Sequence, residues 1–124
     1  MKKLKFAKKK KWNKTTAKRK LDKLFSLKIR SIGICQLQGD KIRCGGVLQC
    51  CHIIGRANLF LRWHPDNAIS ACQGHHVWFT YHPEAWRKRM EEMFPMEYQW
   101  LLDNREQKIT FNEVYYKKKL KELV

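Results

Sequence analysis

Four residues with metal-binding side chains, arranged as two pairs, constrain the fold of this chain more than any other feature. The pairs are Cys35 with Cys44 and Cys72 with His75. The two-residue spacer of the second pair lets both side chains converge on one ion, and the glycines at 45 and 46 suit the tight turn after a knuckle cysteine. Three thiolates and one imidazole make an ordinary tetrahedral structural zinc site. The sequence therefore predicts a zinc ion that joins the two pairs and supports a small core.

Buried thiols without a metal are the alternative interpretation, because the first pair is separated by eight residues where zinc sites typically have two to four. The chain holds five cysteines, an odd number, and no apolar segment follows its basic N-terminus as an export signal requires. We therefore expect ligands or reduced thiols in place of disulfides. The remaining Cys50 and Cys51 are interpreted as buried thiols, with replacement of Cys44 as a zinc ligand as the alternative.

Positive charge is concentrated at the N-terminus. Residues 1–30 contain fourteen Lys and Arg residues and one acid, Asp22, so they carry +13 of the net charge of +16. A lysine run repels itself and has little to bury, so residues 1–18 are predicted to be a disordered arm. Nucleic acid is its favoured partner, through counterion release, over a solubilising role or an anionic lipid surface. The lysines of the run are Lys8, Lys9, Lys10 and Lys11.

The rest of the chain, residues 19–124, is predicted to be one α+β domain with its core at about 30–95. Apolar spacing predicts a short amphipathic helix over 20–30. Glycines then separate two apolar segments, 32–35 and 47–51, which we interpret as the strands of a hairpin. Residues 53–63 have no regular pattern and predict an irregular loop. Residues 66–71 are interpreted as an extended or turn segment before a helix that begins near Gln73.

The C-terminal part, about 84–123, is predicted to be helical. Pro83 begins one helix and Pro95 the next, and both continue an apolar stripe. Thr110 followed by Glu113 has the spacing of a capping box and predicts a last amphipathic helix from Phe111 to about Lys119. These helices are interpreted as a dimer interface or as a cover for the core. No apolar stretch approaches the roughly 20 residues that a membrane span needs, so membrane-spanning proteins are excluded.

Three further polar residues, His52, Asn67 and His76, follow a strand, a loop and a helix in that order. The segments read LQCCHII at 48–54, LRWHPDNA at 61–68 and CQGHH at 72–76. Taken singly, each has an ordinary explanation as a hydrogen-bonded core histidine or a turn asparagine. Together, beside a zinc framework, they resemble the HNH nucleases, the ββα-metal or treble-clef endonuclease superfamily.

A closer resemblance is carried by DKLFSLKIR at 22–30, HIIGR at 52–56 and LRW at 61–63. These segments resemble phage NinG/Rap-type recombination endonucleases, which are associated with cutting branched or recombining DNA. The nuclease likeness covers roughly residues 20–95. It implies a phage-encoded protein that works on double-stranded or branched DNA in the cytoplasm of a bacterial host. Sequence specificity is expected to be weak, because no recognition helix or second reading domain is visible.

The resemblance implies roles for individual residues. His52 is expected to be the general base that takes a proton from the attacking water. His76 is expected to hold one catalytic Mg²⁺ or Mn²⁺ against the scissile phosphate. Asn67 is expected to fix the loop so that His52 is aimed correctly. Arg56 and Arg62 are expected to clamp phosphates, since a guanidinium matches two phosphate oxygens.

The sequence departs from the superfamily at two positions. Many members have an Asp directly before the base histidine as a second metal ligand, whereas this chain has Cys51, a poor partner for Mg²⁺. His82 is the other candidate ligand, but a surface or DNA-facing histidine is the favoured interpretation of this residue. His64 stands where NinG-like proteins often have an acid, and no role is assigned to it.

A non-catalytic zinc module that binds DNA or RNA is the rival interpretation. It explains the charge and the cysteines, with His52 and His76 as structural residues. It does not explain why Asn67 and His76 stand where an HNH site needs them. The prediction is therefore an HNH endonuclease that hydrolyses phosphodiester bonds, with RNA as a further substrate to test.

Overall fold

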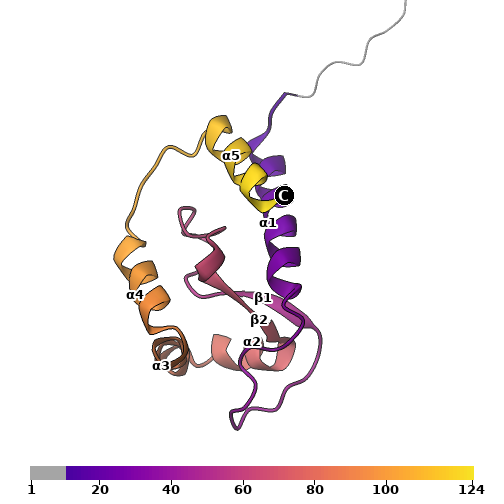
Figure 1. Ribbon diagram of the computed structural model, residues 1–124, viewed down its shortest axis with the longest axis vertical. Coiled ribbons are helices and arrows are strands. Elements are labelled where there is room, and N and C mark those ends of the chain that lie inside the picture. Colours follow the sequence, from indigo (N-terminus) through magenta and orange to yellow (C-terminus); the bar gives the residue numbers. More distant parts are fainter. Residues whose placement is uncertain (1–10) are drawn as a thin grey trace, which may run out of the picture.

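The computed structural model describes residues 11–124 and has α+β architecture (Figure 1), as predicted. Within this part of the chain, five α-helices and one short 3-10 helix accompany a two-stranded sheet. None of the described helices is long and apolar enough to cross a membrane. In chain order the elements are α1 (Lys14–Arg30), β1 (Leu48–His52), η1 (Pro65–Asn67), β2 (Ala68–Cys72), α2 (Gln73–Thr80), α3 (Pro83–Met93), α4 (Pro95–Asn104) and α5 (Glu113–Leu123).

The sheet is an antiparallel pair in which β1 lies against β2, with Leu48 opposite Cys72 and His52 opposite Ala68. The predicted hairpin between 32–35 and 47–51 is therefore wrong, because residues 68–72 supply the partner strand. Every residue of β2 is buried, as expected for a strand covered on both faces. Residues 32–35 form no strand, and α1 ends in a turn over 31–33, where Gly33 has a φ of 82° that only glycine adopts easily.

Helix α1 begins before the predicted helix does. Asn13 caps it by accepting a hydrogen bond from the Thr16 backbone N–H at 3.1 Å. Residues 14–18 of the predicted arm are therefore helical, and Ala17 begins the buried stripe that continues through Leu21, Phe25 and Ile29. Lys11 is exposed. Residues 1–10, with Lys8, Lys9 and Lys10, lie outside the described part of the chain.

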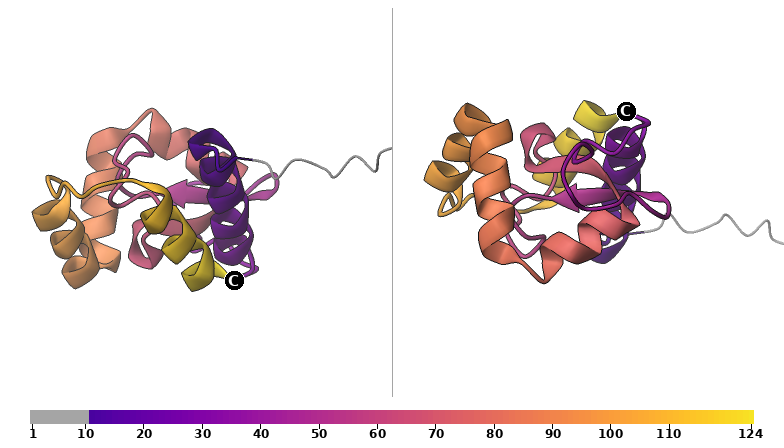
Figure 2. Two further views of the ribbon diagram at one scale, coloured as in Figure 1. Left: turned by 90° about the horizontal axis from the view of Figure 1, so that it is seen from above. Right: turned by 90° about the horizontal axis from the view of Figure 1, so that it is seen from below.

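Two clusters of buried side chains hold the helices to the sheet. One lies between the sheet and α2, α3 and α4; the other lies between α1, α5 and the loop before η1, around Trp63 and Tyr116. Figure 2 accordingly shows α1 and α5 side by side, with α3 and α4 on the opposite side of the sheet. The helices predicted at Pro83 and Pro95 are confirmed. The predicted capping box is wrong, because Asn112 and not Thr110 caps α5, through the Tyr115 backbone N–H at 3.1 Å.

Candidate metal centre and adjoining histidine cavity

The four predicted zinc ligands come together. Their donor atoms, one from each of Cys35, Cys44, Cys72 and His75, all lie within 4.8 Å of one another. The Nδ1 of His75 is 3.1 Å from the Cys72 Sγ, 3.5 Å from the Cys44 Sγ and 3.7 Å from the Cys35 Sγ. Ligands of a tetrahedral zinc ion with ordinary bond lengths are separated by roughly 3.5 Å. The cluster can therefore bind a structural metal ion such as zinc.

Local backbone structure explains how the two pairs meet. Cys72 ends β2 and caps α2, where its Sγ accepts a hydrogen bond from the His75 backbone N–H at 3.4 Å. The first turn of α2 thus places both ligands on one side. The turn after Cys44 then docks on this helix, because the Gly74 N–H donates to the Gly45 carbonyl at 2.9 Å. Gly46 has a φ of 80°, and a Cβ there would lie 2.6 Å from the Gln73 side chain.

The thiols of the cluster differ in acidity. Burial alone would raise the pKa of Cys72, but hydrogen bonds from the His75 and Gly45 backbones and the His75 side chain lower it to about 6. Desolvation and the neighbouring Cys35 and Cys72 raise the pKa of Cys44 to about 11. The site therefore accepts one negative charge readily and resists a second, so that a bound cation is needed to keep several thiolates together.

Asp40 is a functional residue of this cluster that the sequence analysis missed. Its Oδ1 lies 2.9 Å from the His75 Nε2, on the opposite side of the ring from the sulfur atoms. Metal-binding histidines commonly donate their second N–H to a carboxylate in this way. Thirty-five positions separate the two residues, and no motif marks the pair.

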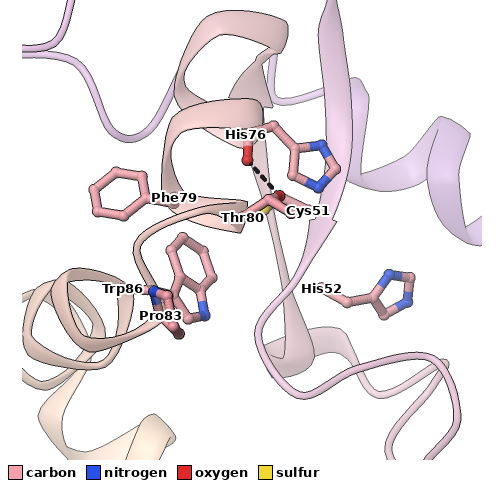
Figure 3. A pocket seen from close by; sticks show the side chains of 7 residues that line it. All are labelled: Cys51, His52, His76, Phe79, Thr80, Pro83 and Trp86. Atoms are coloured by element: carbon pink, nitrogen blue, oxygen red, sulfur yellow. Dashed lines mark hydrogen bonds between the residues drawn. The ribbon is translucent and has the colours of Figure 1, made fainter.

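His52 and His76 line one cavity of about 220 Å³, together with Cys51, Phe79, Thr80, Pro83 and Trp86. His52 ends β1 and His76 lies in the first half of α2, and both side chains project to the same side in Figure 3. His76 is not part of the metal cluster, because its neighbour His75 supplies the nitrogen there. The structure therefore brings together the two histidines that were predicted to form a catalytic site.

A backbone contact defines the protonation of His52. Its Nε2 lies 2.8 Å from the carbonyl oxygen of Arg62. A carbonyl only accepts, so Nε2 carries the proton and Nδ1 keeps a free lone pair. Burial lowers the pKa of His52, against a smaller rise from this hydrogen bond. The neutral imidazole, the form that a general base requires, is thus favoured near pH 7.

His76 is held in a similar way by a residue that sequence reasoning missed. Its Nδ1 lies 2.7 Å from the Oε1 of Gln49, a strand residue three positions before His52. With Nδ1 as the donor, the lone pair of Nε2 is free to bind a cation. Burial also lowers the pKa of His76.

Asn67 is fully buried but does not line the histidine cavity. Its Oδ1 accepts the Ile54 backbone N–H at 2.7 Å, and its Nδ2 donates to the carbonyls of Ile54 and Leu61, each at 3.0 Å. These contacts hold the loop between β1 and η1, and the expected consequence, that the loop aims His52, stays a prediction.

The two arginines differ in exposure. Arg62 is 14% exposed and forms a fork with Asp22, Nε to Oδ1 at 3.0 Å and Nη2 to Oδ2 at 2.6 Å. Arg56 is 59% exposed and contacts the same carboxylate through Nη2 at 2.8 Å. Arg56 thus keeps donors facing solvent, whereas most of the Arg62 side chain is engaged within the protein. Asp22 joins both arginines, and sequence reasoning missed it because no spacing along the chain links it to either one.

The remaining histidines and cysteines take other positions. The His82 ring stacks on Trp78 at 3.9 Å and is not among the residues that line the histidine cavity. His64 caps η1 by accepting the Asp66 backbone N–H at 3.1 Å. Burial raises the pKa of Cys51 to about 12 and that of Cys50 to about 11. Both are therefore neutral thiols near pH 7, and neither belongs to the metal cluster.

Comparison with family models, curated proteins and solved structures gives no significant match to this chain.

Proposed function

We propose that this chain is a metal-dependent DNA endonuclease of the HNH type, built on a structural zinc site. The observation that carries the proposal is the shared cavity of His52 and His76. Each ring uses one nitrogen in a hydrogen bond, to the Arg62 carbonyl and to Gln49 respectively, and keeps the other free. A base and a cation ligand in one cavity are the two groups that phosphodiester hydrolysis needs from a small protein.

The residues divide the reaction between them. The Nδ1 of His52 removes a proton from a water molecule as its oxygen attacks phosphorus, and the bond from phosphorus to the 3′-oxygen breaks. The Nε2 of His76 would hold Mg²⁺ or Mn²⁺, which when bound stabilises the charge on the phosphate and on the leaving oxygen. Cys51 contributes apolar lining to the cavity, because a neutral thiol is a poor ligand for either ion.

Cations beside His52 supply a path for the phosphate backbone. Asp22, Ser26 and Arg56 line a second cavity, of about 180 Å³, on which His52 also opens. Helical spacing places Arg19, Lys23 and Arg30 of α1 along this same edge, and all three are exposed. The described part of the chain offers these cations in addition to the basic segment before α1. Affinity for DNA is accordingly proposed to be electrostatic and weakly specific. Branched or recombining DNA, which the sequence resemblance implies, is the proposed substrate.

Supercoiled plasmid tests the proposal. The parent protein is incubated with plasmid and Mg²⁺, Mn²⁺ or no added divalent ion, beside His76→Ala and a matched control, His82→Ala. Zinc content is measured for each protein, so that a collapsed cluster is not mistaken for a lost catalytic ion. We expect divalent-dependent nicking by the parent and by His82→Ala, and at least a 100-fold slower reaction for His76→Ala.

Other outcomes contradict the proposal. Equal nicking by His76→Ala removes the assigned role of that residue. Binding of plasmid without nicking under either ion supports the non-catalytic module instead. The same incubations with RNA distinguish a ribonuclease, which would use the same cavity.

A further inference from the structure

We propose that Asp22 of α1 is a positioning residue for His52, and that it acts through the peptide group that joins Arg62 to Trp63. Its consequence for catalysis rests on the proposed nuclease function. The structural part of the proposal, that Asp22 of α1 controls the orientation of the His52 ring, does not depend on that function.

The carboxylate of Asp22 holds the side chains of the two residues that this peptide group joins. Its Oδ1 accepts hydrogen bonds from the Arg62 Nε at 3.0 Å and from the Trp63 Nε1 at 2.9 Å, and its Oδ2 accepts the Arg62 Nη2 at 2.6 Å. The carbonyl of Arg62 lies between these two anchored side chains, and it is the acceptor for the His52 Nε2 at 2.8 Å. Trp63 is 1% exposed, so the second anchor is fixed by packing as well.

The loop that carries this carbonyl needs such an anchor. Residues 53–64 form neither helix nor strand, and segments of this kind open locally more easily than a sheet does. Asn67 holds the preceding carbonyl, that of Leu61, at 3.0 Å. Asp22 adds a contact to the side chain of Arg62, the residue whose carbonyl accepts the His52 proton.

The same helix also restrains the imidazole ring itself. Phe25, one turn after Asp22, lies with its ring 5.5 Å from that of His52. α1 therefore acts on His52 twice, by packing on one face and by fixing the acceptor of its Nε2 proton. If the Arg62 carbonyl moved, the Nε2–H of His52 would lose its acceptor and the ring could turn. Nδ1 would then no longer point at the attacking water.

Proton exchange at the two bonded histidines tests the inference in the folded, zinc-loaded full chain. The Nε2 proton of His52 reports on the Arg62 contact, and the Nε2 proton of His75, bonded to Asp40, is an internal reference in a different site. Both are followed by ¹⁵N-edited NMR above pH 7. His52→Gln assigns the first signal.

Two variants remove the fork in different ways. Asp22→Asn keeps the shape and removes the charge, and Arg62→Lys keeps the charge and removes the planar geometry. In both we expect the His52 proton to exchange at least about tenfold faster while the His75 proton is unchanged. Asp103→Asn, at an exposed helix position bonded to Gln99, should change neither signal. Unchanged exchange at His52 would overturn the inference. An equal increase at both histidines would also overturn it, because that result indicates general destabilisation.

Cleavage rates then test the catalytic consequence. We expect Asp22→Asn to lower kcat about 10–100-fold, the usual cost of losing a residue that orients a site, with little change in KM. A rise in KM with kcat unchanged would contradict positioning. If the parent itself does not cut DNA, the proposed function fails, and the exchange measurement still decides the role of Asp22.

Discussion

The Oδ1 of Asp40 and the Nε2 of His75 lie 2.9 Å apart, although 35 positions separate the two residues. The opposite nitrogen of the ring faces the three sulfur atoms of the cluster. The carboxylate therefore fixes which nitrogen is presented to a metal ion and increases the electron density on it.

Asp40→Asn should weaken zinc binding about 10–100-fold, the range found when such partners of metal ligands are changed. Competition with a coloured chelator measures the affinity. Asp66→Asn, at an exposed position on η1, is the matched control and should bind zinc like the parent. Equal affinity in all three proteins would show that Asp40 does not support the cluster.

Asn67→Ala should lower the free energy of unfolding by about 3 kcal/mol, because it leaves the Ile54 N–H and two carbonyls unpaired in a buried position. Urea unfolding measures the change. Asn112→Ala, which removes only the cap of α5, should cost about 1 kcal/mol. A cost for Asn67→Ala no larger than that of the cap variant would mean that its amide does not hold the loop.

The rate of DNA cleavage should depend on pH through His52. Burial lowers the pKa of this imidazole from its ordinary 6.5, so the base is already unprotonated at pH 7. As the pH falls, kcat/KM should decrease along an acid limb whose midpoint lies below 6.5, where His52 gains a proton. An acid limb centred above pH 7 would contradict a buried, neutral base. If the residual rate of His52→Gln lacks this limb, the limb belongs to His52 and not to a phosphate group or a surface histidine.

Deletion of residues 1–10 should weaken DNA binding and reduce its dependence on salt. The segment holds six Lys residues, so the slope of log affinity against log salt should decrease by up to about 5. The deletion ends before Lys14 because α1 begins there and Ala17 is buried. The thermal transition should be unchanged. An unaltered salt slope would show that this segment does not contact DNA.

The residues of the candidate site could be predicted where the ligands of a pair, or a ligand and its turn, lie close together in the sequence. Cys72 and His75 share one helical turn, and the glycines after Cys44 allow a tight approach, so the predicted convergence of the four candidate ligands is confirmed. The starts of α3 and α4 were predicted because a proline suits the first turn of a helix.

Contacts between distant segments could not be predicted in this way. Residues 68–72 pair with β1 although AISAC has no alternating pattern, because both faces of β2 are covered. Asp40 and Gln49 contact His75 and His76 only through the fold, and no spacing links them beforehand. The same holds for Asp22, which binds the side chain of Arg62, the residue whose carbonyl contacts His52. Asn112 could have been chosen as the cap of α5 instead of Thr110, since both residue types cap helices.

The nicking rate of His52→Ala relative to the parent tests the central claim most directly. Both proteins are brought to one zinc per chain and given supercoiled plasmid with Mn²⁺. Loss of a general base typically costs 10²–10⁴-fold, so we predict a rate at least about 100-fold lower with plasmid binding retained. Equal rates in the two proteins, or no cleavage by the parent with Mg²⁺ or Mn²⁺, would contradict a hydrolytic site built on His52 and His76.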